Sequence, residues 1–225
     1  MQRDSRPLFP IDRAGWPFIT IAAIGAALTA VLGGSAVALP FGLLALVFLF
    51  FFRDPERRPP TDPGVVLSPA DGRVLVAGPA DAGAAPPGEW LQISIFLSPL
   101  DVHVNRVPVS GRVVRVNVRR GRYLPAYRPE AAGSNECSEV WIDHDGQAVV
   151  IRQLVGILAR RVVCRLQPDR HVEAGERFGV MKFGSRMDVF LPVTAVLSVS
   201  VGDRVRGGET VIARLPHAVV RNTED

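Results

Sequence analysis

The chain has few cysteines and widely spaced histidines, and each shortage argues against a kind of site. Cys137 and Cys164 stand alone without CxxC spacing, so neither a zinc site nor a redox pair is indicated, and a reducing compartment fits. The histidines form no HExxH or similar ligand pattern. We therefore predict no metal. The four histidines are His103, His144, His171 and His217.

Lysine is almost absent, since Lys182 is the only lysine among 26 lysine and arginine residues, and the formal net charge is +4. Arginine matches phosphate geometry with paired donors, although genome composition alone produces the same bias. No basic stretch alternates with aromatic residues, so we predict no nucleic-acid partner. Beside an apolar segment the charge favours anionic lipid, by about 1 kcal/mol per basic residue near the surface.

Charged residues are also missing between Gly15 and Phe52. One bilayer-spanning helix needs about 20 apolar residues, so this run is too long for one helix and tight for two. Gly33, Gly34 and Pro40 lie in its middle, where glycine and proline interrupt a helix. We predict an apolar helical hairpin with helices over 16–32 and 39–52.

Basic residues flank the hairpin on both sides, and the positive-inside tendency then places both ends in the cytoplasm. A signal peptide is the alternative, but the run exceeds a signal core and ends without a small-residue cleavage site. We expect the cell membrane, with the following domain on its cytoplasmic side. The short second helix leaves open whether the hairpin spans the bilayer or dips into one leaflet. The flanking arginines are Arg3, Arg6, Arg13, Arg53, Arg57 and Arg58.

A proline-rich stretch follows the hairpin over 54–63, and its prolines favour an extended linker. We predict a membrane anchor over 1–58 and one domain over 59–225, long enough to bury its own core. The domain's short or alternating apolar runs indicate a mainly β (α+β) fold. One helix-like piece runs from Leu154 to Arg161. The expected strands lie within 73–76, 90–97, 113–118, 140–142, 148–154 and 189–201.

Three polar positions carry candidate chemistry. Ser185 follows Gly184 between two apolar runs, and its hydroxyl can attack the preceding carbonyl if the backbone is strained. A tight turn or bulge is the plainer interpretation. His103 can carry protons near neutral pH or serve as a hydrogen-bonded structural histidine. Asp71 precedes Gly72, as many hairpin-turn residues precede glycine.

The order of the motifs is more specific than any one of them. After the apolar hairpin come Phe52-Arg53-Asp54-Pro55, Ser68-Pro69-Ala70-Asp71-Gly72, Phe96 to Arg106 with its Asp101-Val102-His103, Ala159-Arg160-Arg161, and Lys182-Phe183-Gly184-Ser185-Arg186. This order resembles the short, membrane-anchored form of phosphatidylserine decarboxylase, from about Phe52 to Pro192.

The resemblance implies a proenzyme that cuts itself between Gly184 and Ser185, leaving a β chain over 1–184 and an α chain over 185–225. Ser185 becomes a covalent pyruvoyl group, which replaces pyridoxal phosphate as the electron sink. Through a Schiff base with phosphatidylserine it releases carbon dioxide and gives phosphatidylethanolamine. The implied partners are membrane phosphatidylserine and the paired α and β chains, with further oligomerisation left open.

The resemblance also assigns residue roles. His103 is the candidate proton donor, and Asp71 matches the aspartate linked to self-cleavage. Longer enzymes of the family carry a second histidine, implicated in activating the serine, where this chain has Arg106. Either His103 then serves both steps, or Asp71 and backbone groups activate Ser185.

Substrate contacts are predicted from arginine chemistry. Arg160 and Arg161 are candidates for the lipid phosphate, because a guanidinium matches its geometry, and Arg106 is a third candidate. Surface charge at the end of a short helix is an equal alternative for Arg160 and Arg161, since cations are favoured there.

A carrier module is the alternative from another class of protein. Val180 to Phe183, followed by the run 201–211, resembles the carrier half of biotinyl or lipoyl domains, in which Lys182 would hold a swinging cofactor. The shared pattern predicts a barrel-sandwich-like C-terminal part. Biotin carriers have methionine on both sides of the lysine, whereas Phe183 follows it here, and a carrier leaves Asp71 and His103 unexplained. A membrane-anchored β domain that only binds partners is the third alternative.

Overall fold

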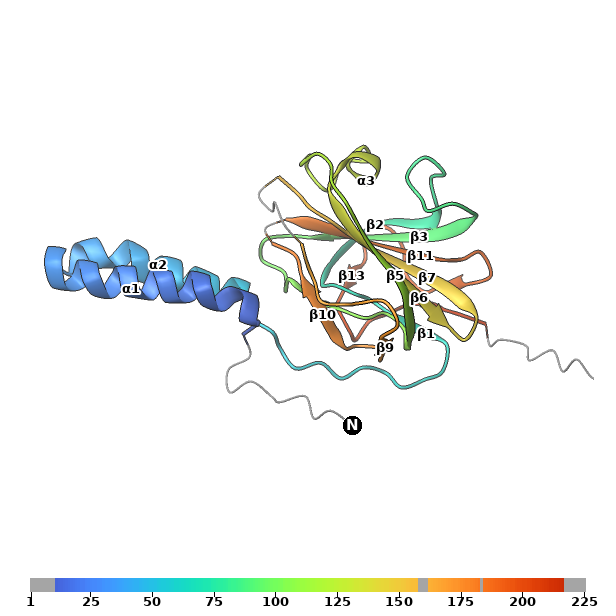
Figure 1. Ribbon diagram of the computed structural model, residues 1–225, viewed down its shortest axis with the longest axis horizontal. Coiled ribbons are helices and arrows are strands. Elements are labelled where there is room, and N and C mark those ends of the chain that lie inside the picture. The colour runs from blue at the N-terminus through green and yellow to red at the C-terminus, as the bar shows by residue number, and fades with distance from the viewer. Residues whose placement is uncertain (1–10, 158–161, 183, 217–225) are drawn as a thin grey trace, which may run out of the picture.

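The computed structural model describes residues 11–157, 162–182 and 184–216, in which an apolar helical hairpin projects from a β domain (Figure 1). A short 3-10 helix, η1 (Arg13–Gly15), leads into α1 (Trp16–Gly33), and α2 (Ser35–Phe51) runs back beside it. The turn is made at Gly34, whose φ of +82° suits glycine. The predicted hairpin is therefore present.

One bound of the predicted hairpin is wrong, because α2 begins at Ser35 and not at Leu39, so that Pro40 lies inside the helix. A proline removes one intrahelical hydrogen bond, and α2 tolerates this loss while it packs along α1. The packing is close: a Cβ on Gly25 would lie 2.9 Å from the Phe41 ring. Small residues allow helices to approach in this way.

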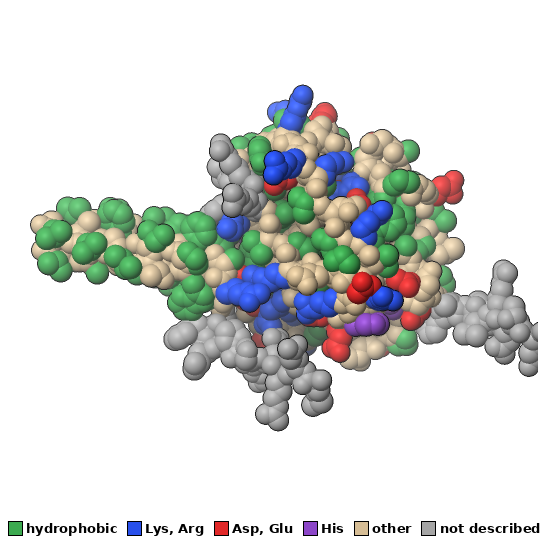
Figure 2. All heavy atoms as spheres, in the orientation of Figure 1, with side chains coloured by type: hydrophobic (Ala, Val, Ile, Leu, Met, Phe, Trp, Pro, Cys, Tyr) green, Lys and Arg blue, Asp and Glu red, His purple; other side chains and the backbone are tan. Residues whose placement is uncertain are grey.

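The outward faces of the hairpin are apolar along its length (Figure 2). Arg13–Gly33 covers 21 residues and contains an 18-residue window with a mean hydropathy of 1.8, so it is long and apolar enough to cross a membrane, and α2 is a shorter apolar helix. Val31 and Leu32, at the far tip, are 84% and 83% exposed. A surface of this kind is stable in contact with lipid.

The β domain contains an eight-stranded antiparallel sheet in the order β13-β2-β3-β11-β7-β6-β5-β9 and two three-stranded sheets, β1-β14-β12 and β4-β10-β8. This confirms a mainly β domain behind an apolar N-terminal hairpin. The strands are β1 (Val65–Leu67), β2 (Gly72–Pro79), β3 (Trp90–Leu97), β4 (Val104–Arg106), β5 (Gly111–Arg119), β6 (Cys137–His144), β7 (Gln147–Leu154), β8 (Val163–Cys164), β9 (His171–Val172), β10 (Arg177–Val180), β11 (Ser185–Pro192), β12 (Val196–Leu197), β13 (Arg204–Val205) and β14 (Val211–Arg214), with one short helix, α3 (Ala131–Ser134).

β11 lies inside the large sheet and is buried on both faces. Met187, Val189 and Leu191 point into the main core, as alternation along a strand requires. On the other face Arg186 Nε donates to Asp188 Oδ1 at 2.6 Å, and both side chains are buried. Backbone pairing to β3 and β7 on its two edges completes the enclosure.

The helix expected from Leu154 to Arg161 is not found in its described part. Leu154 ends β7, and residues 155–157 are irregular, while 158–161 lie outside the described residues. The apolar run before this segment continues the strand because Leu154 pairs with both Arg186 and Cys137. Tertiary pairing thus overrides the local helical pattern.

Candidate active site

Gly184 and Ser185 stand at the start of β11. Gly184 has a φ of +73°, in the left-handed region that only glycine enters readily. Ser185 is fully buried, and its Oγ donates to the Lys182 carbonyl at 3.2 Å. The serine that follows the bent glycine is therefore held inside the protein with its hydroxyl turned back along the chain.

His103 lies between β3 and β4 and is 1% exposed. Its Nδ1 is 2.9 Å from the Asp101 carbonyl, and because a carbonyl only accepts, Nδ1 carries the proton. The other ring nitrogen, Nε2, is buried with no hydrogen-bond partner among the described residues. Burial lowers the pKa of His103 to about 4, so the ring is neutral at pH 7 and Nε2 is an unprotonated base.

Phe51, the last residue of α2, covers the His103 ring, and the two ring centroids are 4.1 Å apart. Phe51 is itself 3% exposed and belongs to a small apolar cluster that includes Val102, Val104 and Phe52. The end of the apolar hairpin thus removes water from the imidazole. This contact places His103 where the hairpin joins the β domain.

Ser185 and His103 are tied to the same stretch of chain. The Met181 N–H donates to the His103 carbonyl at 3.1 Å, while Ser185 Oγ bonds the next residue, Lys182. Across the sheet Ser185 pairs with Leu97, and a tight turn from Ser98 to Asp101 then leads to His103. The structure therefore brings these two predicted residues to one end of the sheet.

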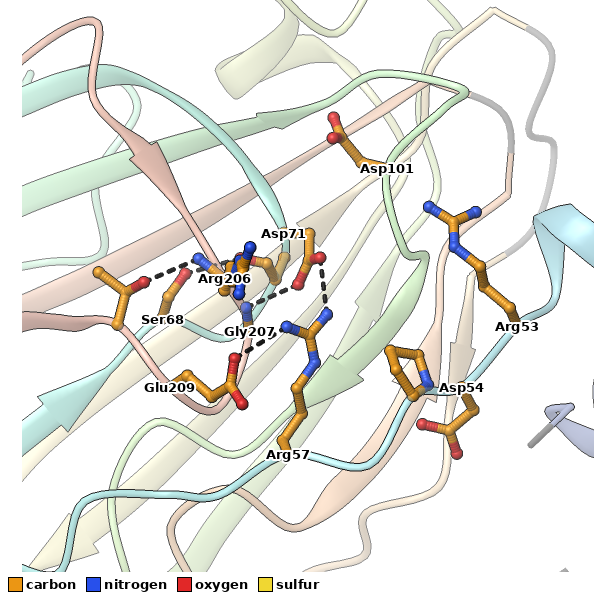
Figure 3. Close-up of polar contacts among 12 residues, drawn as sticks. Arg53, Asp54, Arg57, Ser68, Asp71, Asp101, Arg206, Gly207 and Glu209 are labelled. Atoms are coloured by element: carbon orange, nitrogen blue, oxygen red, sulfur yellow. Dashed lines mark hydrogen bonds and ion pairs between the residues drawn. The ribbon is translucent and has the colours of Figure 1, made fainter.

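Asp71 precedes β2 at the same end of the sheet, with β3 between β2 and β11. Its Oδ2 accepts from Arg57 Nη2 at 2.7 Å, and its Oδ1 accepts from the Gly207 N–H at 2.7 Å (Figure 3). Arg57 also binds Glu209, at 3.0 Å. The Asp71 carboxylate is thus fixed by a linker residue and by the turn before β14.

Arg106 occupies a buried internal site. Its guanidinium donates to Asp54 Oδ1 at 2.9 Å, to the Pro55 carbonyl at 3.0 Å and to the Gly175 carbonyl at 3.1 Å. Its side chain is 7% exposed. These contacts hold the linker on the β domain and lend no support to lipid binding by Arg106. Arg160 and Arg161 lie outside the described residues.

Ion pairs hold both ends of the hairpin on the β domain. Asp12, before α1, receives two hydrogen bonds from Arg165, at 2.7 and 2.9 Å. Asp54, after α2, pairs with Arg106 and also with Arg177 at 2.5 Å. Paired, largely buried carboxylates of this kind orient the hairpin relative to the site.

The surroundings of Lys182 bear on the carrier alternative. Lys182 is half-buried, with its ammonium 4.8 Å from the ring centroid of Phe18 on α1, which does not suit a lysine that must swing a cofactor between sites. Within the described ranges, no cluster of three or more histidine, cysteine or acidic side chains is arranged to hold a metal ion.

Sequence reasoning did not single out Phe51, Arg57 or Gly156 as part of the site. Phe51 and Arg57 lie next to the recognised Phe52-Arg53-Asp54-Pro55 segment, but no spacing rule indicates which side chains of a linker turn inward. Gly156 has the most direct contact: a Cβ on it would lie 1.9 Å from the carbonyl oxygen of Gly184. Only the fold reveals that contact.

Comparison with known proteins identifies the family. A family model described as phosphatidylserine decarboxylase matches residues 44–213. A phosphatidylserine decarboxylase proenzyme of Desulfotalea psychrophila is 40% identical over 93% of this chain and 99% of its own length. Proenzymes of the same description from Nitrosomonas europaea and Paramagnetospirillum magneticum are each 42% identical, over 93% and 92% of this chain and 98% and 88% of their own lengths. The chain therefore belongs to the phosphatidylserine decarboxylase family.

Proposed function

We propose that this protein converts phosphatidylserine to phosphatidylethanolamine and carbon dioxide, after cutting itself between Gly184 and Ser185. The observation that carries the proposal is a left-handed glycine directly before a fully buried serine, at the end of the sheet that also holds His103. Family membership supplies the substrate class, since the relatives are named for this decarboxylation and as proenzymes.

Self-cleavage begins with the Ser185 hydroxyl. Oγ bonds to the Gly184 carbonyl carbon, the C–N bond breaks, and the hydroxyl proton passes to the released nitrogen, leaving an ester. Loss of the Cα proton of residue 185 then breaks the Cβ–Oγ bond and frees Gly184 as a carboxylate. The remaining dehydroalanine takes up water and loses ammonia to become a pyruvoyl group. The β chain is then 1–184 and the α chain 185–225.

His103 is our candidate for proton transfer in both stages. The neutral ring with a proton on Nδ1 leaves Nε2 able to accept a proton first and to return it later as an acid. Arg106 takes no part in activating the serine in this proposal, because its guanidinium is bound to Asp54 and two carbonyls. Asp71 acts from the adjacent end of β2, held by Arg57 and Gly207.

The pyruvoyl group would supply a sink for the electron pair left on the substrate's α-carbon when its carboxylate departs as carbon dioxide, without pyridoxal phosphate or a metal. Its precursor fits this role, since Ser185 is 0% exposed and a ketone formed there is shielded from bulk water. The surrounding residues provide the proton carrier, His103, and a rigid strand that fixes the position of residue 185.

We further propose that the hairpin, within the anchor 1–58, lies in the cell membrane and that the domain 59–225 faces the cytoplasm. His103 packs against the last residue of α2, so the site lies close to the bilayer surface from which the lipid headgroup would enter. Basic side chains on the β domain beside the base of the hairpin (Figure 2) favour anionic lipid at this surface.

The two chains are expected to remain together after the cut. β11, the first strand of the α chain, pairs with β3 over Ser185–Pro192 and with β7 over five residue pairs, Arg186↔Leu154 to Phe190↔Val150. All of these partners belong to the β chain. Separation would break a buried sheet and expose the core.

Mass spectrometry of the purified protein tests the cut and the cofactor together. We expect two chains, with residue 185 lacking an amine, and release of carbon dioxide from phosphatidylserine that hydroxylamine abolishes. The Ser185→Ala variant should remain one inactive chain. An intact wild-type chain with a modified Lys182 would overturn the proposal in favour of a carrier.

A further inference from the structure

Gly156 lies opposite the bond that is proposed to be cut. β7 and β11 pair with Leu154 opposite Arg186, and the same register carried two residues further sets Gly156 opposite Gly184. A Cβ on Gly156 would lie 1.9 Å from the Gly184 oxygen and 3.1 Å from its carbonyl carbon. The carbonyl oxygen therefore occupies the place where any other residue would have its side chain.

The need for glycine at 156 comes from space and not from backbone conformation. Gly156 is not among the residues with positive φ, whereas Gly184 is. The φ at 156 therefore gives no reason for glycine. The main effect of a Cβ at this position is therefore its clash with the Gly184 carbonyl.

We infer that Gly156 is a positioning residue for self-cleavage, because its missing side chain sets the orientation of the Gly184 carbonyl toward Ser185. This inference rests on the proposed function. When Oγ of Ser185 bonds to the carbonyl carbon, the carbonyl oxygen takes the charge and the C–N bond lengthens, so the direction of the carbonyl determines the line of attack.

The residue before Gly156 is held on both its backbone groups, which opposes a retreat of Gly156 from an added methyl group. Asn135 is 0% exposed, and its Nδ2 donates to the Val155 carbonyl at 2.9 Å. The Val155 N–H donates to Glu136 at 3.1 Å, and the methyl group of Ala126 lies 3.7 Å from the Cβ position of residue 156. The carbonyl of Gly184, which follows a bent backbone, is the part that moves.

The size of the effect follows from the overlap. Cβ atoms essentially never approach other heavy atoms closer than 3.0 Å, and the contact here is 1.9 Å, so alanine displaces the carbonyl by about 1 Å. A misplacement of about 1 Å slows a reaction by about 100-fold. Gly156→Ala should therefore accumulate uncut chain.

Gly111→Ala is the matched control. A Cβ there would lie 2.2 Å from the Asp143 carbonyl oxygen and 3.0 Å from its carbon, a similar clash between β5 and β6, away from β11 in the sheet order. Both substitutions are made in the full chain, alone and together with Ser185→Ala. The melting temperature is measured in the uncut double variants, and the cleavage rate in the single variants by mass spectrometry.

We expect similar losses of melting temperature in the two variants, with cleavage slowed about 100-fold in Gly156→Ala and unchanged in Gly111→Ala. Hydroxylamine, which cuts esters and leaves amides, should speed cutting of the wild type and not of Gly156→Ala, because formation of the ester is then the slow step. If Gly156 had only a structural role, hydroxylamine would speed the cutting of Gly156→Ala as it does that of the wild type.

Three outcomes overturn the inference and leave the proposed function intact. In the first, Gly156→Ala is cut at the wild-type rate, and in the second, Gly111→Ala is slowed as much as Gly156→Ala. In the third outcome the double variant of Gly156→Ala with Ser185→Ala does not fold, whereas that of Gly111→Ala with Ser185→Ala does. The last outcome would give Gly156 a role in folding alone. A wild-type chain that stays uncut counts instead against the proposed function, and with it against the inference.

Discussion

The Arg57 guanidinium lies 2.7 Å from the Asp71 carboxylate and 3.0 Å from Glu209. Arg57 and Asp71 precede the proposed cut, whereas Glu209 follows it. One side chain of the linker after the hairpin therefore contacts both future chains. The Gly207 N–H completes the arrangement by donating to the second Asp71 oxygen.

Replacing Arg57 should slow maturation. Arg57→Met removes one of the two groups that bind Asp71, and because the Arg57 side chain is 8% exposed, the loss of its charged hydrogen bonds costs about 1.5–3 kcal/mol of stability. We expect a lower melting temperature and slower conversion to two chains. Arg58→Met, at an exposed neighbouring position, is the control. Equal conversion rates in both variants would contradict a role for Arg57.

His103 should make folding stability depend on pH. Its folded pKa of about 4 lies below the unfolded value of 6.5, so the unfolded chain binds more protons between these values. The stabilisation is complete above pH 6.5 and is lost as pH falls toward 4, by about 3 kcal/mol at most. Thermal unfolding of Ser185→Ala with and without His103→Gln measures this, and identical pH slopes would refute it.

Phe51 should control the protonation of His103. Phe51→Ala lets water reach the ring that now lies 4.1 Å away, which weakens the desolvation that lowers the pKa. The acidic limb of the pH–activity profile is then expected to move to higher pH. Leu49→Ala, at an exposed position of α2, should leave the profile in place. A pH–activity profile unchanged by Phe51→Ala would show that the hairpin does not affect the pKa of His103.

Much of the architecture could be predicted because its signals are local. The absence of charge from Gly15 to Phe52 and the paired glycines at 33 and 34 suffice for a hairpin, and alternation suffices for strands such as Trp90–Leu97. The start of the second helix and the helix expected after Leu154 were predicted wrongly, because packing along α1 and the pairing of Leu154 with β6 and β11 decide the structure there. Neither the helix packing nor the strand pairing can be recognised from the neighbouring residues in the sequence.

The site could be predicted only in part, for a similar reason. Ser185, His103 and Asp71 lie in motifs whose order resembles a family. Phe51 and Gly156 stand out in no such motif. Phe51 covers the His103 ring, and Gly156 leaves room for the Gly184 carbonyl. Such roles depend on which segments meet across the fold, so they become visible only when the strands are paired.

Substitution of Arg106 distinguishes a structural ion pair from a contact with the lipid phosphate. The buried pair of Arg106 with Asp54 predicts that Arg106→Met leaves a buried carboxylate partly unpaired, at a cost of about 3–5 kcal/mol, while the KM of the folded fraction for phosphatidylserine in mixed micelles stays unchanged. Arg106→Lys, which keeps the charge but not the forked donors, should recover part of the stability. If Arg106 held the lipid phosphate instead, Arg106→Met would raise KM in a protein of normal melting temperature. Unfolding curves and initial rates on the same preparations separate these results.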